Sequence, residues 1–182
     1  LRDPYLLYVG NLKPHKNIPC LTKAYAMLPK FHRDRIKLVI AGSGSSGVRE
    51  LDRLGQALGV RQNLLFFSSV SDSLLRYLYA GAEVTVLPSI QEGFGLPVLE
   101  SMACGTPVIC SSTSSLPEVG GDAALYFDPH QPEDLAAKLL QVLDDPAQRS
   151  RMAAAGTVQA QKFSWDECSR KHAEVFRSVI FR

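Results

Sequence analysis

The chain has 182 residues, of which 46% are hydrophobic and 21% charged, a composition that excludes disordered and fibrous classes and predicts one globular domain with a full core. Its 20 basic and 18 acidic residues leave a formal charge of +2, so no global field predicts binding to nucleic acid or to a membrane surface. The longest apolar runs fall far short of the roughly 20 residues that a membrane span requires.

Short apolar runs alternate with segments of helical periodicity as far as Asp128-Pro129. This alternation is typical of β-α-β units, and it predicts an α/β, Rossmann-like doubly wound parallel sheet of about six strands. The predicted strands are 5–9, 36–41, 64–67, 84–87, 108–110 and 125–127, and the predicted helices between them are 18–28, 48–58, 72–80 and 97–103.

The rest of the chain shows helical periodicity only, and we expect a helical tail at about 131–182 within one domain that spans 1–182. Ser164 is the predicted N-cap of the last helix, with Glu167 as its capping-box partner. We expect the lone Trp165 to pack in the core as an anchor for that helix. The predicted helices of the tail are 132–143, 147–162 and 166–181.

The loop after the fourth predicted strand is the most informative segment, because ligands of parallel sheets bind beyond the carboxyl ends of the strands. Gly93 and Gly95 allow positive φ and a close approach to a ligand, and Pro97 suits the first turn of a helix. The amides ahead of Pro97 would then lie at a helix N-terminus, where phosphate oxygens bind favourably.

Two carboxylates border this predicted anion site. Glu92 lies in the loop and Glu100 about one helical turn past its end, so both can accept hydrogen bonds from vicinal sugar hydroxyls. From the residues alone, an equally good interpretation is that Glu100 only stabilises the helix dipole and Glu92 is a solvated loop residue.

The loop after the first predicted strand carries Lys13 and Lys16 ahead of a helix. A lysine at this edge of the sheet can neutralise a diphosphate, although both lysines can equally be surface charges with Asn17 as a helix N-cap. The two loops are complementary, since one offers cations and the other amides and carboxylates.

A third loop, 42–47, has the pattern G-x-G-x-x-G of dinucleotide-binding folds. The acidic residue that such a site requires after the next strand is missing from the segment 66–69, so a plain glycine-rich turn is the preferred interpretation over nicotinamide binding. The four histidines are isolated and no D-x-D pair occurs, and we therefore expect neither a metal nor another cofactor.

The four cysteines are scattered, which favours reduced thiols and a cytoplasmic location. The first residues have no signal-peptide pattern, which favours the same compartment. The sequence starts without Met, just before a strand, so we expect it to be a segment of a longer protein with a partner domain that is absent here.

The segment from Glu92 to Glu100 resembles the Glu, seven residues, Glu motif of retaining glycosyltransferases of family 4, also called group 1. The resemblance extends over nearly the whole chain in the family's order, through the segments 8–17, 38–44, 102–109, 116–124 and 163–165. It implies one half of a GT-B fold, namely the C-terminal, donor-binding Rossmann-like domain. It also implies that an N-terminal acceptor domain of the same enzyme is missing, and any membrane contact would be made through that domain.

The resemblance assigns roles to residues of this site. Glu100 would bind the ribose hydroxyls, Glu92 the hydroxyls of the donor sugar, and Lys16 the diphosphate. The family often has an arginine where this chain has Asn11, and a glycine where it has Ser68. Main-chain groups of the loop 67–70 would contact the base. The further donor-binding residues implied are Gly10, Asn11, Phe67, Val70, Gly93, Phe94, Gly95 and Leu96.

The predicted function is transfer of a hexosyl group from a nucleotide diphosphate sugar to an acceptor hydroxyl, with retention of configuration. Glu92 and Lys16 are the predicted catalytic residues, and the segment 11–17 is most similar to mannosyltransferase-like members, which favours GDP-mannose. The alternatives are a nucleotide-sugar epimerase of the same fold and a non-catalytic Rossmann-like nucleotide-binding module. We expect the isolated domain to bind donor but to have little activity without its N-terminal half.

Overall fold

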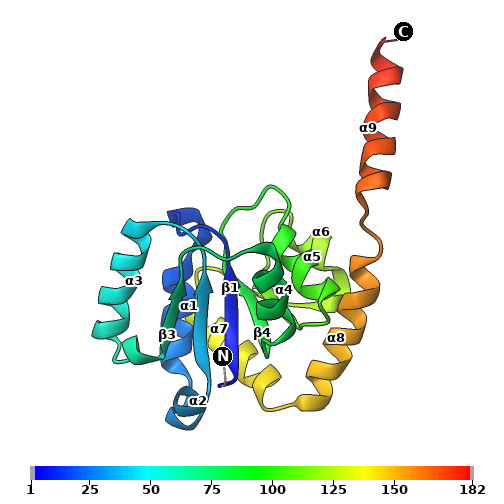
Figure 1. Ribbon diagram of the computed structural model, residues 1–182. Coiled ribbons are helices and arrows are strands. Elements are labelled where there is room, and N and C mark those ends of the chain that lie inside the picture. Colours follow the sequence, from blue (N-terminus) through cyan, green and yellow to red (C-terminus); the bar gives the residue numbers. More distant parts are fainter. Residues whose placement is uncertain (1–2, 181–182) are drawn as a thin grey trace.

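A computed structural model of the chain describes residues 3–180, apart from the side chains of Ser45 and Ser46. Six parallel strands form one sheet in the order β3-β2-β1-β4-β5-β6, which is the order of a doubly wound fold and confirms the predicted fold class (Figure 1). The strands are β1 Tyr5–Val9, β2 Lys37–Ala41, β3 Leu64–Phe67, β4 Val84–Leu87, β5 Val108–Ser111 and β6 Ala124–Phe127.

The central strands are buried on both faces, which explains why they appear in the sequence as continuous apolar runs. β1 pairs with β2 along its whole length, from Tyr5 with Lys37 to Val9 with Ala41. With β4 on its other side it pairs only at Leu6 and Leu7. The carboxyl ends of β1 and β4 therefore separate, and this is the point where the strand order reverses and where such folds open a crevice.

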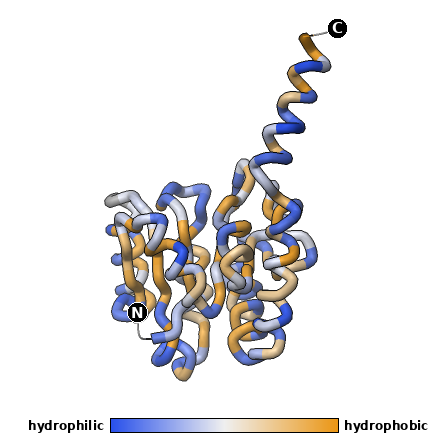
Figure 2. The backbone as a smooth tube through the Cα atoms, turned by 45° about the vertical axis from the view of Figure 1, so that its right-hand side comes forward, coloured by the Kyte–Doolittle hydropathy of each residue, from blue (hydrophilic) through white to orange (hydrophobic). Residues whose placement is uncertain are grey.

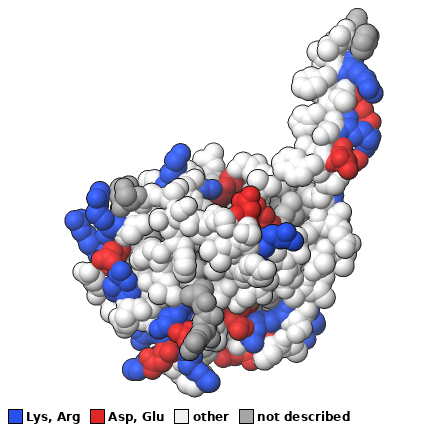
Figure 3. Space-filling model, in the orientation of Figure 1, with Lys and Arg blue, Asp and Glu red and all other residues white. Residues whose placement is uncertain are grey.

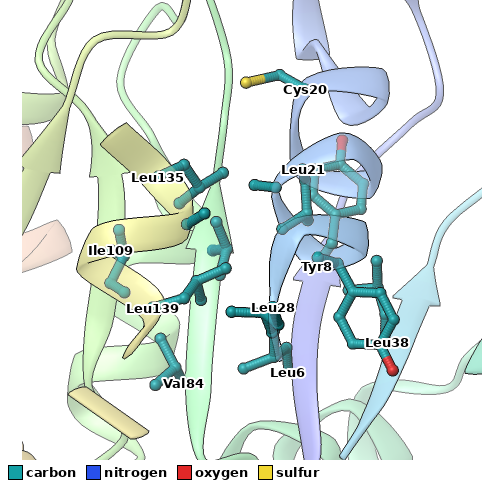
Figure 4. Close-up of a cluster of buried hydrophobic side chains, with 14 of the residues drawn as sticks. Leu6, Tyr8, Cys20, Leu21, Leu28, Leu38, Val84, Ile109, Leu135 and Leu139 are labelled. Carbon is teal, nitrogen blue, oxygen red and sulfur yellow. The ribbon is translucent and has the colours of Figure 1, made fainter. Parts of the chain in front are cut away.

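Helices cover both faces of the sheet (Figure 1). On one face α1 and α7 pack around Leu6 and Tyr8 of β1, and Figure 4 shows Leu21 of α1 and Leu28, just after it, facing Leu135 and Leu139 of α7. On the other face α4, α5 and α6 supply the apolar partners. The bounds are α1 Ile18–Met27, α2 Lys30–Arg35, α3 Ser45–Ala57, α4 Asp72–Ala80, α5 Leu96–Ala103, α6 Leu116–Gly120, α7 Pro132–Leu143, α8 Pro146–Ala160 and α9 Trp165–Ile180.

The predicted strands and long helices agree with the structure to within a few residues at each end. The short helices α2 and α6 were not predicted, and neither were the 3₁₀ turns η1 Pro14–Lys16, η2 Arg61–Asn63 and η3 Gly121–Ala123. α2 buries none of its residues, and α6 is a single turn, so neither leaves a periodic apolar pattern in the sequence.

The helical tail is confirmed, but its last two helices, α8 and α9, differ in their contacts with the domain. α8 packs against α5, with Gly156 close to the side chain of Met102. α9 extends away from the domain and buries none of its described residues, and its charged side chains lie along one side (Figures 1 and 3). The apolar residues of α9 alternate with these charges along the helix in Figure 2.

Trp165 was predicted to be a core residue, and this prediction is wrong because its side chain is 76% exposed. It occupies the start of α9, where the chain has already left the domain surface. The N-cap prediction is confirmed, since the Glu167 amide donates to Ser164 Oγ at 3.1 Å. The capping box is wrong, because the Glu167 carboxylate accepts hydrogen bonds from Arg170 instead.

Within residues 3–180, none of the helices combines the length and the apolar character that crossing a membrane would require. Acidic and basic side chains are intermixed over the face drawn in Figure 3, in keeping with the formal charge of +2. Any anion site must therefore be built from local charges, such as those in the loops that follow β1 and β4.

Candidate functional site

The carboxyl ends of β1 and β4 bring together the two loops that the sequence analysis paired. The loop after β1 and the loop after β4 are joined by a backbone hydrogen bond from the Ile90 amide to the His15 carbonyl, at 2.8 Å. η1 then places Lys16 beside the loop after β4, and its turn closes through a hydrogen bond from the Asn17 amide to the Pro14 carbonyl at 3.0 Å. Side chains that are far apart in the sequence thus face one another across the gap.

Lys16 and Glu92 form an ion pair in this gap. Lys16 Nζ lies 2.7 and 2.8 Å from the two carboxylate oxygens of Glu92, and the side chains are only 16% and 11% exposed. Ser89 Oγ donates a further hydrogen bond to Glu92 Oε1 at 2.7 Å. Partial burial makes such a pair stronger than an exposed one, because solvent screens it less.

Asn17 holds the lysine turn in place. Its backbone is left-handed, with φ of 53°, and its side-chain amide donates to the Pro129 carbonyl at 2.8 Å. Asn17 stands at the N-cap position of α1, but its side chain makes no capping hydrogen bond. The residue therefore links the lysine turn to the segment after β6 rather than acting as the predicted cap.

The loop after β5 clamps the backbone of Glu92. The Glu92 amide donates to Ser114 Oγ at 3.1 Å, and the same hydroxyl donates to the Glu92 carbonyl at 2.6 Å. Ser115 Oγ donates to the Phe94 carbonyl at 2.9 Å. Sequence reasoning missed Ser89, Ser114 and Ser115, although a run of hydroxyl residues follows β5 at the same edge of the sheet.

The start of α5 has the geometry that its glycines predict. Gly95 has φ of 102°, and a Cβ there would lie 2.6 Å from Leu116 Cδ2, so the position favours glycine. Gly93 faces open space, and Phe94 and Leu96 are exposed beside it. The amides of Gly95 and Leu96 lie at a helix N-terminus, where a bound anion gains from the helix dipole.

Glu100 lies one turn into α5 and is exposed. Tyr79 of α4, whose side chain is 1% exposed, donates a hydrogen bond from its hydroxyl to Glu100 Oε2 at 2.7 Å. Burial raises the pKa of Tyr79, and the nearby Glu100 charge raises it further, so the hydroxyl keeps its proton and acts as a donor. Sequence reasoning missed Tyr79, which looks like an ordinary core position of an amphipathic helix.

A cavity of about 330 Å³ lies beside Gly10 and Asn11, which belong to the same loop as Lys16. Asn11 shapes this loop, since Tyr8 Oη donates to its carbonyl at 2.7 Å and the Lys13 amide donates to its Oδ1 at 3.2 Å. Phe67 lies at the end of β3 and packs against the apolar cluster that contains Leu7 and Tyr79. The lining residues are Val9, Gly10, Asn11, Ala41, Gly42, Ser43, Ser68, Ser69, Val70 and Leu75.

The glycines of the loop 42–47 pack against the β1 loop. A Cβ at Gly42 would lie 1.7 Å from the Gly10 carbonyl oxygen, and one at Gly47 would lie 2.4 Å from Leu12 Cβ. The Leu12 amide donates to the Ser43 carbonyl at 3.1 Å, which joins the two loops directly. This close packing explains the glycines, but only residues 42–44 form the predicted turn, because α3 already begins at Ser45.

The acidic pair Asp144 and Asp145 lies at helix ends, and Cys20 and Cys110 lie in the core. Across residues 3–180, no cluster of three or more His, Cys, Asp or Glu side chains is arranged to hold a metal ion. Asp144 ends α7, and Asp145 caps α8 by accepting from the Gln148 amide at 2.8 Å. Cys20 and Cys110 are buried thiols, and burial raises the pKa of Cys110 to about 12.

Comparisons with known proteins agree on one family. The family model described as glycosyl transferases group 1 matches residues 1–159. An O-antigen chain mannosyltransferase B from Escherichia coli is 43% identical over 176 residues, which cover 95% of this chain and 45% of that protein. The chain thus spans less than half the length of this relative.

Solved structures place the fold among glycosyltransferases. A sucrose-phosphate synthase from Thermosynechococcus elongatus superposes with a TM-score of 0.87 at 28% identity, covering 98% of this chain and 46% of that one. A C-terminal domain of a group 1 glycosyl transferase from Francisella tularensis superposes with a TM-score of 0.78 at 23% identity. That match covers 87% of this chain and 85% of the other.

Proposed function

The chain belongs to the glycosyl transferases of group 1, and from this premise we propose that its crevice binds a nucleotide diphosphate sugar for transfer of the hexosyl group to an acceptor hydroxyl, with retention of configuration. Lys16 and the start of α5 bind the diphosphate, Glu92 binds the sugar and Glu100 binds the ribose. The chain supplies the donor side of the reaction, and an N-terminal domain of the same enzyme supplies the acceptor side.

The observation that carries the proposal is the Lys16–Glu92 pair beside the N-terminus of α5. An ammonium group has three donors, and the two Glu92 oxygens take two of them at 2.7 and 2.8 Å. The third donor is left for a phosphate oxygen. Lys16 can therefore hold the sugar-binding carboxylate and the diphosphate at the same time.

Departure of the diphosphate is the electrostatically demanding step of such a transfer. Negative charge develops on the leaving phosphate, and a fixed ammonium and oriented amides stabilise it without reorganising during the reaction. Glu92, held by Lys16, Ser89 and Ser114, positions the sugar for attack by the acceptor. We propose that Lys16 and α5 meet this charge without a divalent cation.

For the donor, we propose a mannosyl group carried on GDP as the first candidate. The sugar is supported by the Escherichia coli mannosyltransferase relative and the base by the resemblance of the segment 11–17 to mannosyltransferase-like members. The base enters the cavity between Asn11 and Val70 and contacts the main chain after Phe67.

Calorimetric titration of the chain with GDP, UDP, ADP and NAD tests the proposal. In buffer with EDTA, we expect one nucleoside diphosphate to bind at least about tenfold more tightly than NAD, a difference of about 1.4 kcal/mol. Adding Mg²⁺ should change its affinity by less than about twofold. The absence of binding by every nucleoside diphosphate at millimolar concentration contradicts the proposal, and tight NAD binding favours an oxidoreductase.

A further inference from the structure

Tyr79 is a buried residue of α4 whose hydroxyl reaches the site residue Glu100. Its ring packs in the apolar cluster with Tyr5, Leu7 and Val39, and its backbone carbonyl accepts a hydrogen bond from Thr106 Oγ1 at 2.6 Å. The residue is thus fixed at both its main chain and its ring. Its hydroxyl ends at the Glu100 carboxylate, 2.7 Å away.

Glu100 has few other constraints on its position. It is exposed on α5, and among residues 3–180 Tyr79 is the one hydrogen-bond partner of its carboxylate. An exposed glutamate samples several rotamers, whereas a charge-assisted bond from a rigid phenol selects those that point at Tyr79. Oε2 accepts from the phenol, and Oε1 is left to accept from a ligand.

We propose that Tyr79 is a positioning residue for ribose recognition: its hydroxyl fixes the Glu100 carboxylate so that the carboxylate meets the vicinal hydroxyls of the nucleotide already aligned. The inference rests on the proposed function, since it takes the ribose as the ligand of Glu100. A ligand gains affinity when the group that binds it is ordered before binding.

The test compares the nucleoside diphosphate of highest affinity with its 2′,3′-dideoxy analogue, using calorimetry on the chain and its variants. Removing the Tyr79 hydroxyl in Tyr79→Phe should weaken the ribonucleotide about three- to tenfold. The dideoxy analogue lacks the hydroxyls that Glu100 is proposed to bind. Tyr79→Phe and the unmutated chain should therefore bind this analogue with affinities that differ by less than about twofold. A loss confined to the ribonucleotide is not expected from a merely structural role.

Tyr5→Phe is the matched control. Tyr5 belongs to the same apolar cluster, and its hydroxyl donates to the Leu78 carbonyl of α4 at 2.8 Å, away from Glu100. Tyr5→Phe should change the affinities for the ribonucleotide and for the dideoxy analogue by less than about twofold. Circular dichroism with thermal melting should show that both phenylalanine variants fold, because each loses a single hydroxyl from a packed ring.

Glu100→Ala separates the failure of this inference from the failure of the proposed function. If Glu100→Ala removes the preference for the ribonucleotide and Tyr79→Phe does not reduce it, the positioning role is wrong while the ribose assignment stands. If Glu100→Ala keeps the full preference, the ribose assignment itself is wrong. Equal weakening of both ligands by Tyr79→Phe also overturns the positioning role.

Discussion

The two carboxylates that follow β4 are held in opposite ways. Glu92 is 11% exposed and is bound by Lys16 and Ser89, while Ser114 clamps its backbone. Glu100 is exposed and accepts one hydrogen bond, from Tyr79, within the part of the chain that the structure describes. One carboxylate is thus paired with a cation of the protein, and the other is exposed to solvent.

This difference between an ion-paired and an exposed carboxylate is compatible with binding of a large anionic ligand. A bare carboxylate beside a diphosphate would repel it, but Glu92 is paired with Lys16, the cation that we propose binds the phosphate. An exposed Glu100 fits the proposed ribose ligand, because ribose hydroxyls carry no charge and can donate hydrogen bonds to a carboxylate. The following predictions test whether the neutralised carboxylate and the exposed one behave differently.

Replacing the cation should have the largest effect. Lys16→Met removes the ammonium and leaves Glu92 charged and partly buried, so we expect the affinity for the nucleoside diphosphate to fall about 100-fold, or about 2.7 kcal/mol. The free energy of unfolding should also fall by about 1 to 2 kcal/mol, because the carboxylate loses its partner. Calorimetry and urea denaturation measure the two effects.

Lys13→Met is the matched control for that variant. Lys13 lies in the same loop but is exposed, and we expect its replacement to change the affinity less than threefold or so, as screening by solvent predicts. Equal losses for the two lysine variants would mean that the loop acts through its overall charge. The specific role of the Lys16–Glu92 pair would then be wrong.

Neutralising Glu92 should change the binding of the diphosphate and the binding of the sugar in opposite directions. Glu92→Gln removes a negative charge near the diphosphate and frees Lys16, so the bare nucleoside diphosphate should bind about fivefold more tightly, or about 1 kcal/mol. The nucleotide sugar should lose the extra affinity that its sugar contributes. Weaker binding of the bare nucleoside diphosphate by Glu92→Gln would contradict a repulsive effect of the Glu92 charge on the diphosphate.

The sequence predicts the loops that carry the site better than the residues that hold the site side chains in place. Lys16 and Glu92 could be found because each follows a buried strand, and parallel strands bring such loops to one edge. Tyr79 could not be found, because its pattern reveals a buried helix position and not the place where its hydroxyl ends. Trp165 was misplaced for a related reason: an aromatic ring favours burial, but the domain offers α9 no surface beside it.

The left-handed backbone of Ser114 shows a further limit. Its φ of 60° is a conformation that few residues other than glycine, asparagine and aspartate adopt, and at Ser114 it accompanies two hydrogen bonds between the side-chain hydroxyl and the Glu92 backbone. Such long-range pairing has no local pattern in the sequence. What the sequence does predict is the edge of the sheet at which the pairing takes place.

The smallest expected effect uses Cys104 as a probe of the exposed carboxylate. Burial raises the pKa of the Cys104 thiol, while Arg76 lowers it and Glu100 raises it. Glu100→Gln removes the charge that opposes ionisation, so the thiolate fraction at pH 8 should increase. We expect Cys104 to react about twofold faster with iodoacetamide in a Cys168→Ser background, as followed by mass spectrometry.

Glu92→Gln in the same background is expected to have no effect, because the ion pair with Lys16 already neutralises Glu92. Burial raises the pKa of Cys104, and the charged groups that shift it further are Arg76 and Glu100, not Glu92. The alkylation rate of Cys104 should then stay unchanged. Equal acceleration by both glutamine variants would show that the two carboxylates contribute alike to the potential around α5. A neutralised and an exposed carboxylate could then no longer be distinguished at this site.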